Sequence, residues 1–124
     1  MFSVKPDPDR NTLAIFYGDI VTPDETRRCA DEVRLALPLL RPGFRVVVDL
    51  TALRSMDLAC SARIAEIMEM CNEAGVAEVL RIIPDPTRDI GLQILSLFHY
   101  DNDVYVRTCA SAAEANDLLA TETV

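Results

Sequence analysis

At 124 residues, 50% of them hydrophobic, the chain is long enough for a domain with a real core, and we expect residues 1–124 to form a single domain. Its formal net charge is −8, which argues against nucleic acid and an anionic membrane surface as partners, because both attract clustered lysine and arginine. Lys5 is the one lysine in the sequence, which excludes a mechanism that needs a lysine in the core of the domain.

The N-terminal segment predicts a β-hairpin. Phe2 and Val4 alternate with polar residues and indicate a short first strand, and residues 13–17 indicate a second. Residues 6–11 between them read PDPDRN, in which proline opposes regular pairing and aspartate and asparagine favour turns. Strands separated by so short a loop usually pair antiparallel.

The first predicted helix has a well-marked start. Thr22 suits the N-cap, Pro23 the first helical position, and Glu25 completes a T-x-x-E capping box. We expect Pro38 to disturb the last turn and residues 41–43, Arg-Pro-Gly, to stop the helix. One face is apolar and consists of Cys29, Ala30, Val33, Leu37 and Leu40.

Residues 44–75 are the stretch around which the rest of the chain is organised. Val46, Val47 and Val48 form an apolar run that ends on Asp49, which is typical of an internal strand buried on both faces. A long amphipathic helix follows and ends at Gly75, a good C′ residue. Its apolar face consists of Cys60, Ile64, Ile67, Met68 and Cys71.

Two more strands and another helix complete the predicted sheet. Residues 76–83 predict a fourth strand, in which Arg81 is the one charged residue among apolar ones, and residues 104–108 predict a fifth. Residues 111–114, S-A-A-E, form a second capping box that opens the last helix. We therefore predict an α/β fold: a mostly parallel five-stranded sheet with an antiparallel N-terminal edge strand and four helices.

The remaining helix, residues 87–100, is apolar nearly all round. Ile90, Ile94, Leu97 and Phe98 form the stripe that we expect to face the sheet. Leu92, Leu95 and His99 fall on another line, and an exposed apolar line of this kind usually marks an interface. We expect a homodimer through this face; cover by the C-terminal tail or a loop, or lining of a ligand pocket, would explain the same leucines.

This element order resembles the STAS domain, the fold of the SpoIIAA-like bacterial anti-sigma-factor antagonists. The resemblance covers nearly the whole chain and is carried by VVVDLTALRSMD, by the long helix after it, and by the closing S-A-A-E-A-N-D-L-L. The chain is also similar to STAS-like proteins that overlap with lipid-binding CRAL-TRIO/SEC14 domains. The stretch IPDPTRDIGLQILSLFHY resembles a signature of a less characterised bacterial branch of these proteins.

The resemblance directs attention to the start of the second helix. In the antagonists, a serine in the pattern Asp-Ser-Ser-Gly is phosphorylated there by a partner kinase, whereas residues 57–60 of this chain read D-L-A-C. Asp57 matches, but the phosphoacceptor is not carried over. Ser55 and Ser61 flank the position out of register, so we take Ser55, Asp57 and Ser61 as a candidate regulatory helix N-terminus, where phosphate is favourable. The plainer interpretation of Ser55 is an N-cap.

The sequence predicts no catalytic residue, no cofactor and no metal site. His99 is the one histidine, and neither a nucleophile motif nor a phosphate-binding glycine motif is present. Asp49 and Asp85 follow strands, but turn and capping roles suit them better than a divalent ion, because the necessary acidic pair and late lysine are missing. The four cysteines lie among apolar residues without close pairing, so we expect free buried thiols rather than a disulfide or zinc site.

Two functions stay open at this point. The first is a non-enzymatic interaction or regulatory module that works through itself and an unidentified protein. The second is a carrier for an apolar small molecule or lipid. No apolar run approaches the roughly 20 residues of a membrane span, and the first ten residues lack a signal-peptide pattern, so we expect a cytoplasmic protein without membrane insertion.

Overall fold

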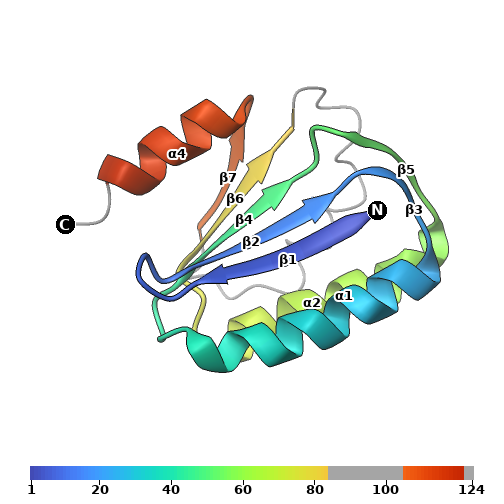
Figure 1. Ribbon diagram of the computed structural model, residues 1–124, viewed down its shortest axis with the longest axis horizontal. Helices are drawn as coiled ribbons and strands as arrows, with labels where there is room; N and C mark the ends of the chain where they lie inside the picture. The colour runs from blue at the N-terminus through green and yellow to red at the C-terminus, as the bar shows by residue number, and fades with distance from the viewer. Residues whose placement is uncertain (84–104, 122–124) are drawn as a thin grey trace.

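The computed structural model describes residues 1–83 and 105–121, which form a five-stranded sheet in the order β1-β2-β4-β6-β7 (Figure 1). Only β1 and β2 pair antiparallel; the other neighbours in this sheet pair parallel. The predicted α/β class, the antiparallel edge and the internal position of the valine strand are therefore confirmed. The strands are β1 (Phe2–Asp7), β2 (Thr12–Tyr17), β4 (Arg45–Asp49), β6 (Glu78–Ile82) and β7 (Tyr105–Cys109).

A second, two-stranded sheet was not predicted. Strands β3 (Asp19–Val21) and β5 (Leu53–Met56) pair parallel beyond one end of the main sheet. The described part of the chain thus has seven strands, where the sequence predicted five for the whole chain. These strands are short, and their register shifts between Asp19 and Ile20, so neither produces a clear period of two.

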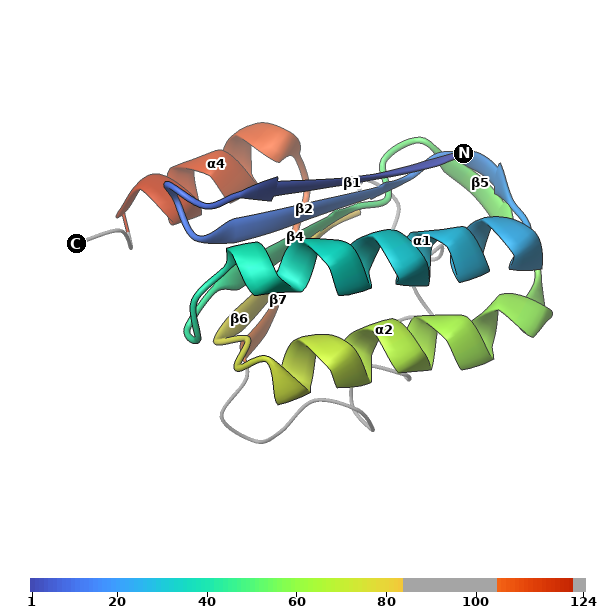
Figure 2. The ribbon, with the colours of Figure 1, turned by 60° about the horizontal axis from the view of Figure 1, so that its bottom comes forward.

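The helices cover both faces of the main sheet. Helices α1 (Pro23–Ala36) and α2 (Ser61–Glu73) lie side by side on one face, and α4 (Ala112–Thr121) lies on the other (Figure 2). The described residues contain these three α-helices, where four were predicted for the whole chain. The remaining predicted helix, residues 87–100, lies outside the described residues.

Side-chain caps fix the starts of helices α1 and α4. The N–H of Glu25 donates to Oγ1 of Thr22 at 3.2 Å, and the N–H of Thr22 donates to Oε1 of Glu25 at 3.1 Å, which confirms the predicted capping box. At α4, Ser111 accepts from the N–H of Glu114, but the Glu114 carboxylate accepts from Ala110 rather than from Ser111. The second capping box is therefore only half formed.

The first two helices also end at the residues that the sequence predicts. Pro38 lies in a short 3-10 turn, η1 (Leu37–Leu39), which closes α1 as expected. Gly75 follows the C-cap of α2 with φ +94°, a conformation that glycine adopts without steric cost. A Cβ at this position would also stand 3.1 Å from Cβ of Pro42.

The central strand β4 separates two apolar cores. Val46 is buried with the cluster beneath α1 and α2, which also contains Leu13, Ile15, Val33, Ile64 and Val79. Val47 points to the opposite face and packs on the cluster beneath α4, which contains Leu80, Ile82, Cys109, Ala115 and Leu119. The sheet is therefore covered on both sides along β6, as expected for parallel strands.

Arg81 is the residue of β6 that departs from the apolar pattern, and it is buried. Its strand neighbour Thr108 lies directly across the β6–β7 pair. Nη2 of Arg81 donates a hydrogen bond to Oγ1 of Thr108 at 3.2 Å, so the charged group has a polar contact inside the fold.

Candidate functional site

The start of helix α2 is built from strand β5 and a short 3-10 turn. Asp57 follows β5 in an extended conformation, and the turn η2 (Leu58–Cys60) runs directly into α2. Oδ1 of Asp57 accepts a hydrogen bond from the N–H of Ala59 at 2.8 Å. Asp57 is thus the N-cap, and its carboxylate stands at the positive end of the helical segment.

The interpretation of Ser55 as an N-cap is wrong. Ser55 is an exposed residue of strand β5 and pairs with Ile20 of β3, two residues before the chain turns into the helix. Asp57 takes the capping position because its carboxylate reaches the first unpaired N–H groups. Ser61 is exposed as the first residue of α2, so the structure places all three sequence-predicted residues at one end of the molecule.

A shallow hollow of about 290 Å³ adjoins this helix start. Ser55 and Asp57 both line it, whereas Ser61 does not. The rest of its lining comes from β3, the start of α1 and β5, namely Ile20, Val21, Thr22, Pro23 and Met56. We call the surface formed by Ile20, Ser55, Met56, Asp57 and Leu58 the β3–β5 face.

Two large apolar side chains stand out in water on the β3–β5 face. Leu58 is 88% exposed, the highest value among the exposed large hydrophobic residues that the structure describes, and Ile20 is 59% exposed. Met56 is half-buried and packs against the core. Sequence periodicity missed Leu58 and Ile20, because one lies in a turn and the other in a strand with a register shift.

The thiol nearest to this face is inert. Cys60 is buried, and its Sγ lies 3.6 Å from the carbonyl oxygen of Val21 in the arrangement of a donated hydrogen bond. Desolvation by burial raises the pKa of the Cys60 thiol above its ordinary value. Because the thiolate is the reactive form, Cys60 packs the helix start against β3 and offers no nucleophile.

The aspartate at the end of β4 serves a turn. Oδ1 of Asp49 accepts hydrogen bonds from the N–H and the hydroxyl of Thr51, at 2.9 and 2.7 Å. Across residues 1–83 and 105–121, no group of three histidine, cysteine, aspartate or glutamate side chains is placed to hold a metal ion. Asp85, the other aspartate that follows a predicted strand, lies outside the described residues.

Leu92, Leu95 and His99, the predicted interface or pocket residues, lie outside the described residues. None of the helices in the described part of the chain has the length and apolar character needed to cross a bilayer. The four cysteines are free and buried, as predicted.

Two solved structures share this architecture across almost their whole length. An uncharacterised protein of the DUF3478 family from Shewanella loihica PV-4, described as having a SpoIIAA-like fold, gives a TM-score of 0.71 at 14% identity, over 96% of this chain and 92% of its own. The anti-sigma factor antagonist SpoIIAA in its unphosphorylated form gives a TM-score of 0.67 at 15% identity, over 97% of this chain and 98% of its own. The chain has a STAS-like fold. No family model and no curated protein matches the sequence.

Proposed function

We propose that this STAS-like protein is a non-enzymatic, cytoplasmic interaction module that binds a protein partner through the β3–β5 face. The fold is that of the anti-sigma factor antagonist SpoIIAA, whose matching structure is of the unphosphorylated form. In the present chain the corresponding helix start offers apolar side chains instead of a phosphoacceptor. The partner would therefore be recognised by apolar contact and not through a phosphate switch.

The observation that carries this proposal is the exposure of Leu58. It occupies the position of the first serine in the Asp-Ser-Ser-Gly pattern, directly after the capping Asp57. A single exposed leucine is ordinary on a protein surface, but Leu58 directly follows Asp57, which lines the hollow together with Ile20. An apolar anchor next to a hollow is the arrangement that protein interfaces favour.

The alternative function, a carrier for an apolar small molecule or lipid, has weaker support. The described residues between the sheet and α2 line a cavity of about 30 Å³. That is room for about one water molecule, whereas ligand pockets typically measure about 300–1,000 Å³. The leucines predicted to line a larger pocket, Leu92 and Leu95, lie outside the described residues.

A quantitative capture experiment tests the proposal. The wild type, Leu58→Glu and Leu35→Glu are immobilised at equal density and exposed to lysate of the native host. Leu35 is the matched control, because it is 76% exposed on α1 and outside the β3–β5 face. We expect a protein retained by the wild type and by Leu35→Glu but lost from Leu58→Glu. Equal retention by all three would contradict the proposal.

Intact-mass analysis of the protein from its own host tests the missing phosphate switch. Leu58 and Ala59 have no hydroxyl group, so we expect the unmodified mass of 13.7 kDa. Stoichiometric phosphate on Ser55 or Ser61 would show that the switch has moved to a neighbouring serine and would overturn this part of the proposal.

A further inference from the structure

The elements that the structure describes cover only part of the face of the main sheet opposite α1 and α2. Helix α4 packs over β6 and β7, and the β1–β2 hairpin stands apart from it (Figure 1). Two adjoining hollows of about 500 and 420 Å³ lie between them and share Arg10, Thr12 and Leu119. We call the two hollows together the arginine groove, because Arg10, Arg41 and Arg45 all line it.

Two of these arginines have no acidic partner. Six other arginines of the described chain lie within 4.0 Å of a carboxylate; Arg34, for example, bridges Asp31 and Glu66. Among the residues that the structure describes, no carboxylate approaches the guanidinium groups of Arg10 and Arg41 in this way. In a protein of net charge −8, two arginines at one hollow without an ion-pair contact are unexpected.

The chain holds these two arginines together by a specific contact. Arg10 belongs to the hairpin turn and Arg41 to the loop after α1, and Asn11 joins the two segments. Nδ2 of Asn11 donates to the carbonyl oxygen of Arg41 at 3.1 Å, and the N–H of Arg41 donates to Oδ1 of Asn11 at 2.8 Å. Asn11 has φ 53°, which asparagine tolerates better than most residues.

A hydroxyl that lacks a protein partner in the described part of the chain lines the same groove. Thr12 is 8% exposed, lies on the α4 side of β2 and lines both hollows. Among the described residues, no group forms a hydrogen bond with its hydroxyl. The hydroxyl is therefore available to donate a hydrogen bond to an anion in the groove.

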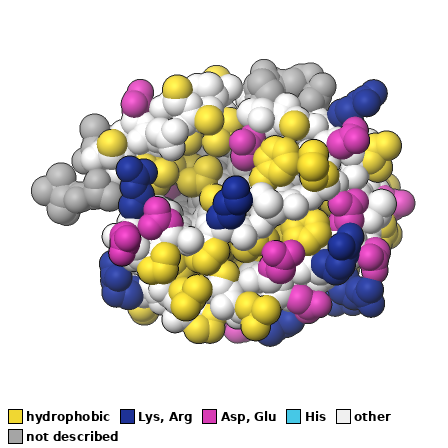
Figure 3. Space-filling view, in the orientation of Figure 1, with side chains coloured by type: hydrophobic (Ala, Val, Ile, Leu, Met, Phe, Trp, Pro, Cys, Tyr) yellow, Lys and Arg dark blue, Asp and Glu magenta, His cyan; other side chains and the backbone are white. Residues whose placement is uncertain are grey.

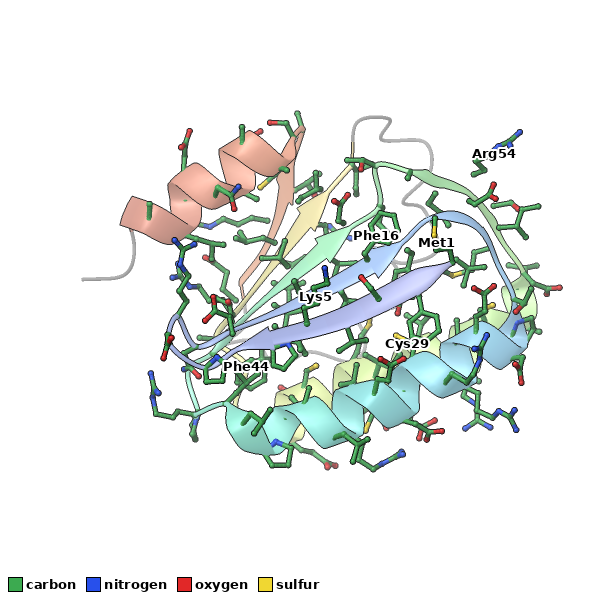
Figure 4. The ribbon with its side chains drawn as sticks, viewed as in Figure 1. Met1, Lys5, Phe16, Cys29, Phe44 and Arg54 are labelled. Atoms are coloured by element: carbon green, nitrogen blue, oxygen red, sulfur yellow. The ribbon has the colours of Figure 1, made fainter. Side chains whose placement is uncertain are left out.

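The groove also has charged walls and an apolar floor. Lys5 adds a fourth cation, and its side chain stands on this open face, well away from Arg54 (Figure 4). Asp7 and Asp9 also line the groove, and Figure 3 shows acidic and basic groups together at the hairpin end. The apolar part of the lining includes Ala14, Val47 and Leu119.

We propose that the arginine groove binds a small organic phosphate monoester. Guanidinium groups match the oxygen geometry of phosphate, and two arginines without a carboxylate partner, beside a free hydroxyl, suit a dianionic head better than a single negative charge. The apolar floor accommodates an uncharged body of modest size, and the volumes of the two hollows are typical of small-molecule sites. This inference goes beyond the proposed function and does not rest on it.

Binding is tested with phenyl phosphate by titration followed in amide NMR spectra of the protein. We expect saturable shifts at the backbone amides of Thr12, Ala14, Val47 and Asn116, and none at Ser55. Benzyl alcohol, which has no charged head, should produce no saturable shift. Affinity for phenyl phosphate should exceed that for inorganic phosphate; equal affinity would contradict the role of the apolar floor.

Matched double variants assign the binding to the arginines. Arg10→Ala/Arg41→Ala should weaken phenyl phosphate binding by about tenfold or more, because each charged hydrogen bond contributes substantially to affinity. Arg27→Ala/Arg54→Ala removes the same number of charges away from the groove and should leave the affinity within about twofold. Equal weakening in both variants would mean that the phosphate responds to the overall charge of the protein and not to the groove, and it would overturn the proposal.

A vesicle experiment distinguishes a free phosphate monoester from a lipid headgroup as the ligand. The wild type is mixed with phosphatidylcholine vesicles that contain phosphatidic acid, and sedimentation measures the bound fraction. The proposal expects the soluble probe to bind and the vesicles to retain little protein, since the net charge is −8. Vesicle binding without saturable binding of phenyl phosphate would overturn it, as would the absence of any saturable binding.

Discussion

At the scale of single residues, burial decides the chemistry of the cysteines. Desolvation raises the pKa of Cys29 to about 11 and that of Cys71 to about 12, from an ordinary value of 9.0. Both thiols therefore stay protonated at any pH near neutrality. Their role is to fill the space between α1 and α2, where Cys29 and Cys71 are fully buried.

These shifts predict how stability depends on alkaline pH. Above about pH 9 the unfolded chain loses thiol protons that the folded chain retains, so the free energy of unfolding should fall as the pH rises through the range 9 to 12. Urea unfolding at pH 8, 9.5 and 10.5 measures this slope. The slope should flatten in Cys29→Ala/Cys71→Ala. An unchanged slope in that variant would show that these two thiols do not cause the pH dependence.

Asn11 combines a backbone role with a side-chain role, and two substitutions separate them. Asn11→Ala loses both hydrogen bonds to Arg41 and places alanine, which tolerates left-handed backbone less well than asparagine, at φ 53°. The free energy of unfolding should therefore fall by about 2–3 kcal/mol. Asn11→Gly keeps the backbone unstrained and should cost about 1–2 kcal/mol. Urea unfolding measures both. If glycine proved as costly as alanine, backbone strain would have no part in the role of Asn11.

At the scale of elements, the two faces of β4 should differ in their tolerance of charge. Val46 is 1% exposed beneath α1 and α2, whereas Val47 is half-buried and borders the arginine groove. Val46→Asp should destabilise the fold by more than about 3 kcal/mol, because an unpaired carboxylate is buried. Val47→Asp should cost less. Thermal unfolding compares them, and equal or reversed costs would contradict the assigned facing of the strand.

Elements with a strong local signal could be predicted from the sequence. The box of Thr22 and Glu25 fixes the start of α1, and the continuous run of three valines marks β4 as a strand, although only Val46 of the three is fully buried. Strands β3 and β5 could not be predicted, because each is too short to show a period and they pair with each other instead of the main sheet. Their pairing is a tertiary effect that local propensity does not record.

The candidate sites also contain features that local sequence predicts and features that depend on the tertiary fold. Asp57 could be located from the sequence because a capping residue acts on its own helix start. The exposure of Leu58 and Ile20 could not, since it depends on what the rest of the fold leaves uncovered. Arg10 and Arg41 come together through tertiary contacts, chiefly those of Asn11 with a loop that is distant in the sequence.

At the scale of the whole molecule, the sequence predicts a homodimer through Leu92, Leu95 and His99. These residues lie outside the described part of the chain, so the dimer stays a prediction. Sedimentation at tens of micromolar should give twice the chain mass of 13.7 kDa for the wild type. Leu92→Glu/Leu95→Glu should give a folded monomer. A monomeric wild type would contradict the dimer, and an unfolded variant would assign these leucines to the core.

The two proposed binding surfaces lie on different parts of the molecule and differ in character. The β3–β5 face presents exposed apolar side chains at the start of α2, and the arginine groove presents cations between α4 and the hairpin. A protein partner and a small anion could therefore bind without competing for the same residues. Variants in one surface should leave binding at the other unchanged.

The most direct test of the central claim is the affinity of the captured partner for Leu58 variants. Titration of the purified partner should give a Kd that is about tenfold or more higher for Leu58→Glu than for the wild type, because a charge replaces an apolar anchor. Leu35→Glu, equally charged and similarly exposed, should stay within about twofold. An unchanged Kd for Leu58→Glu, or an equal loss in both variants, would contradict recognition through the β3–β5 face.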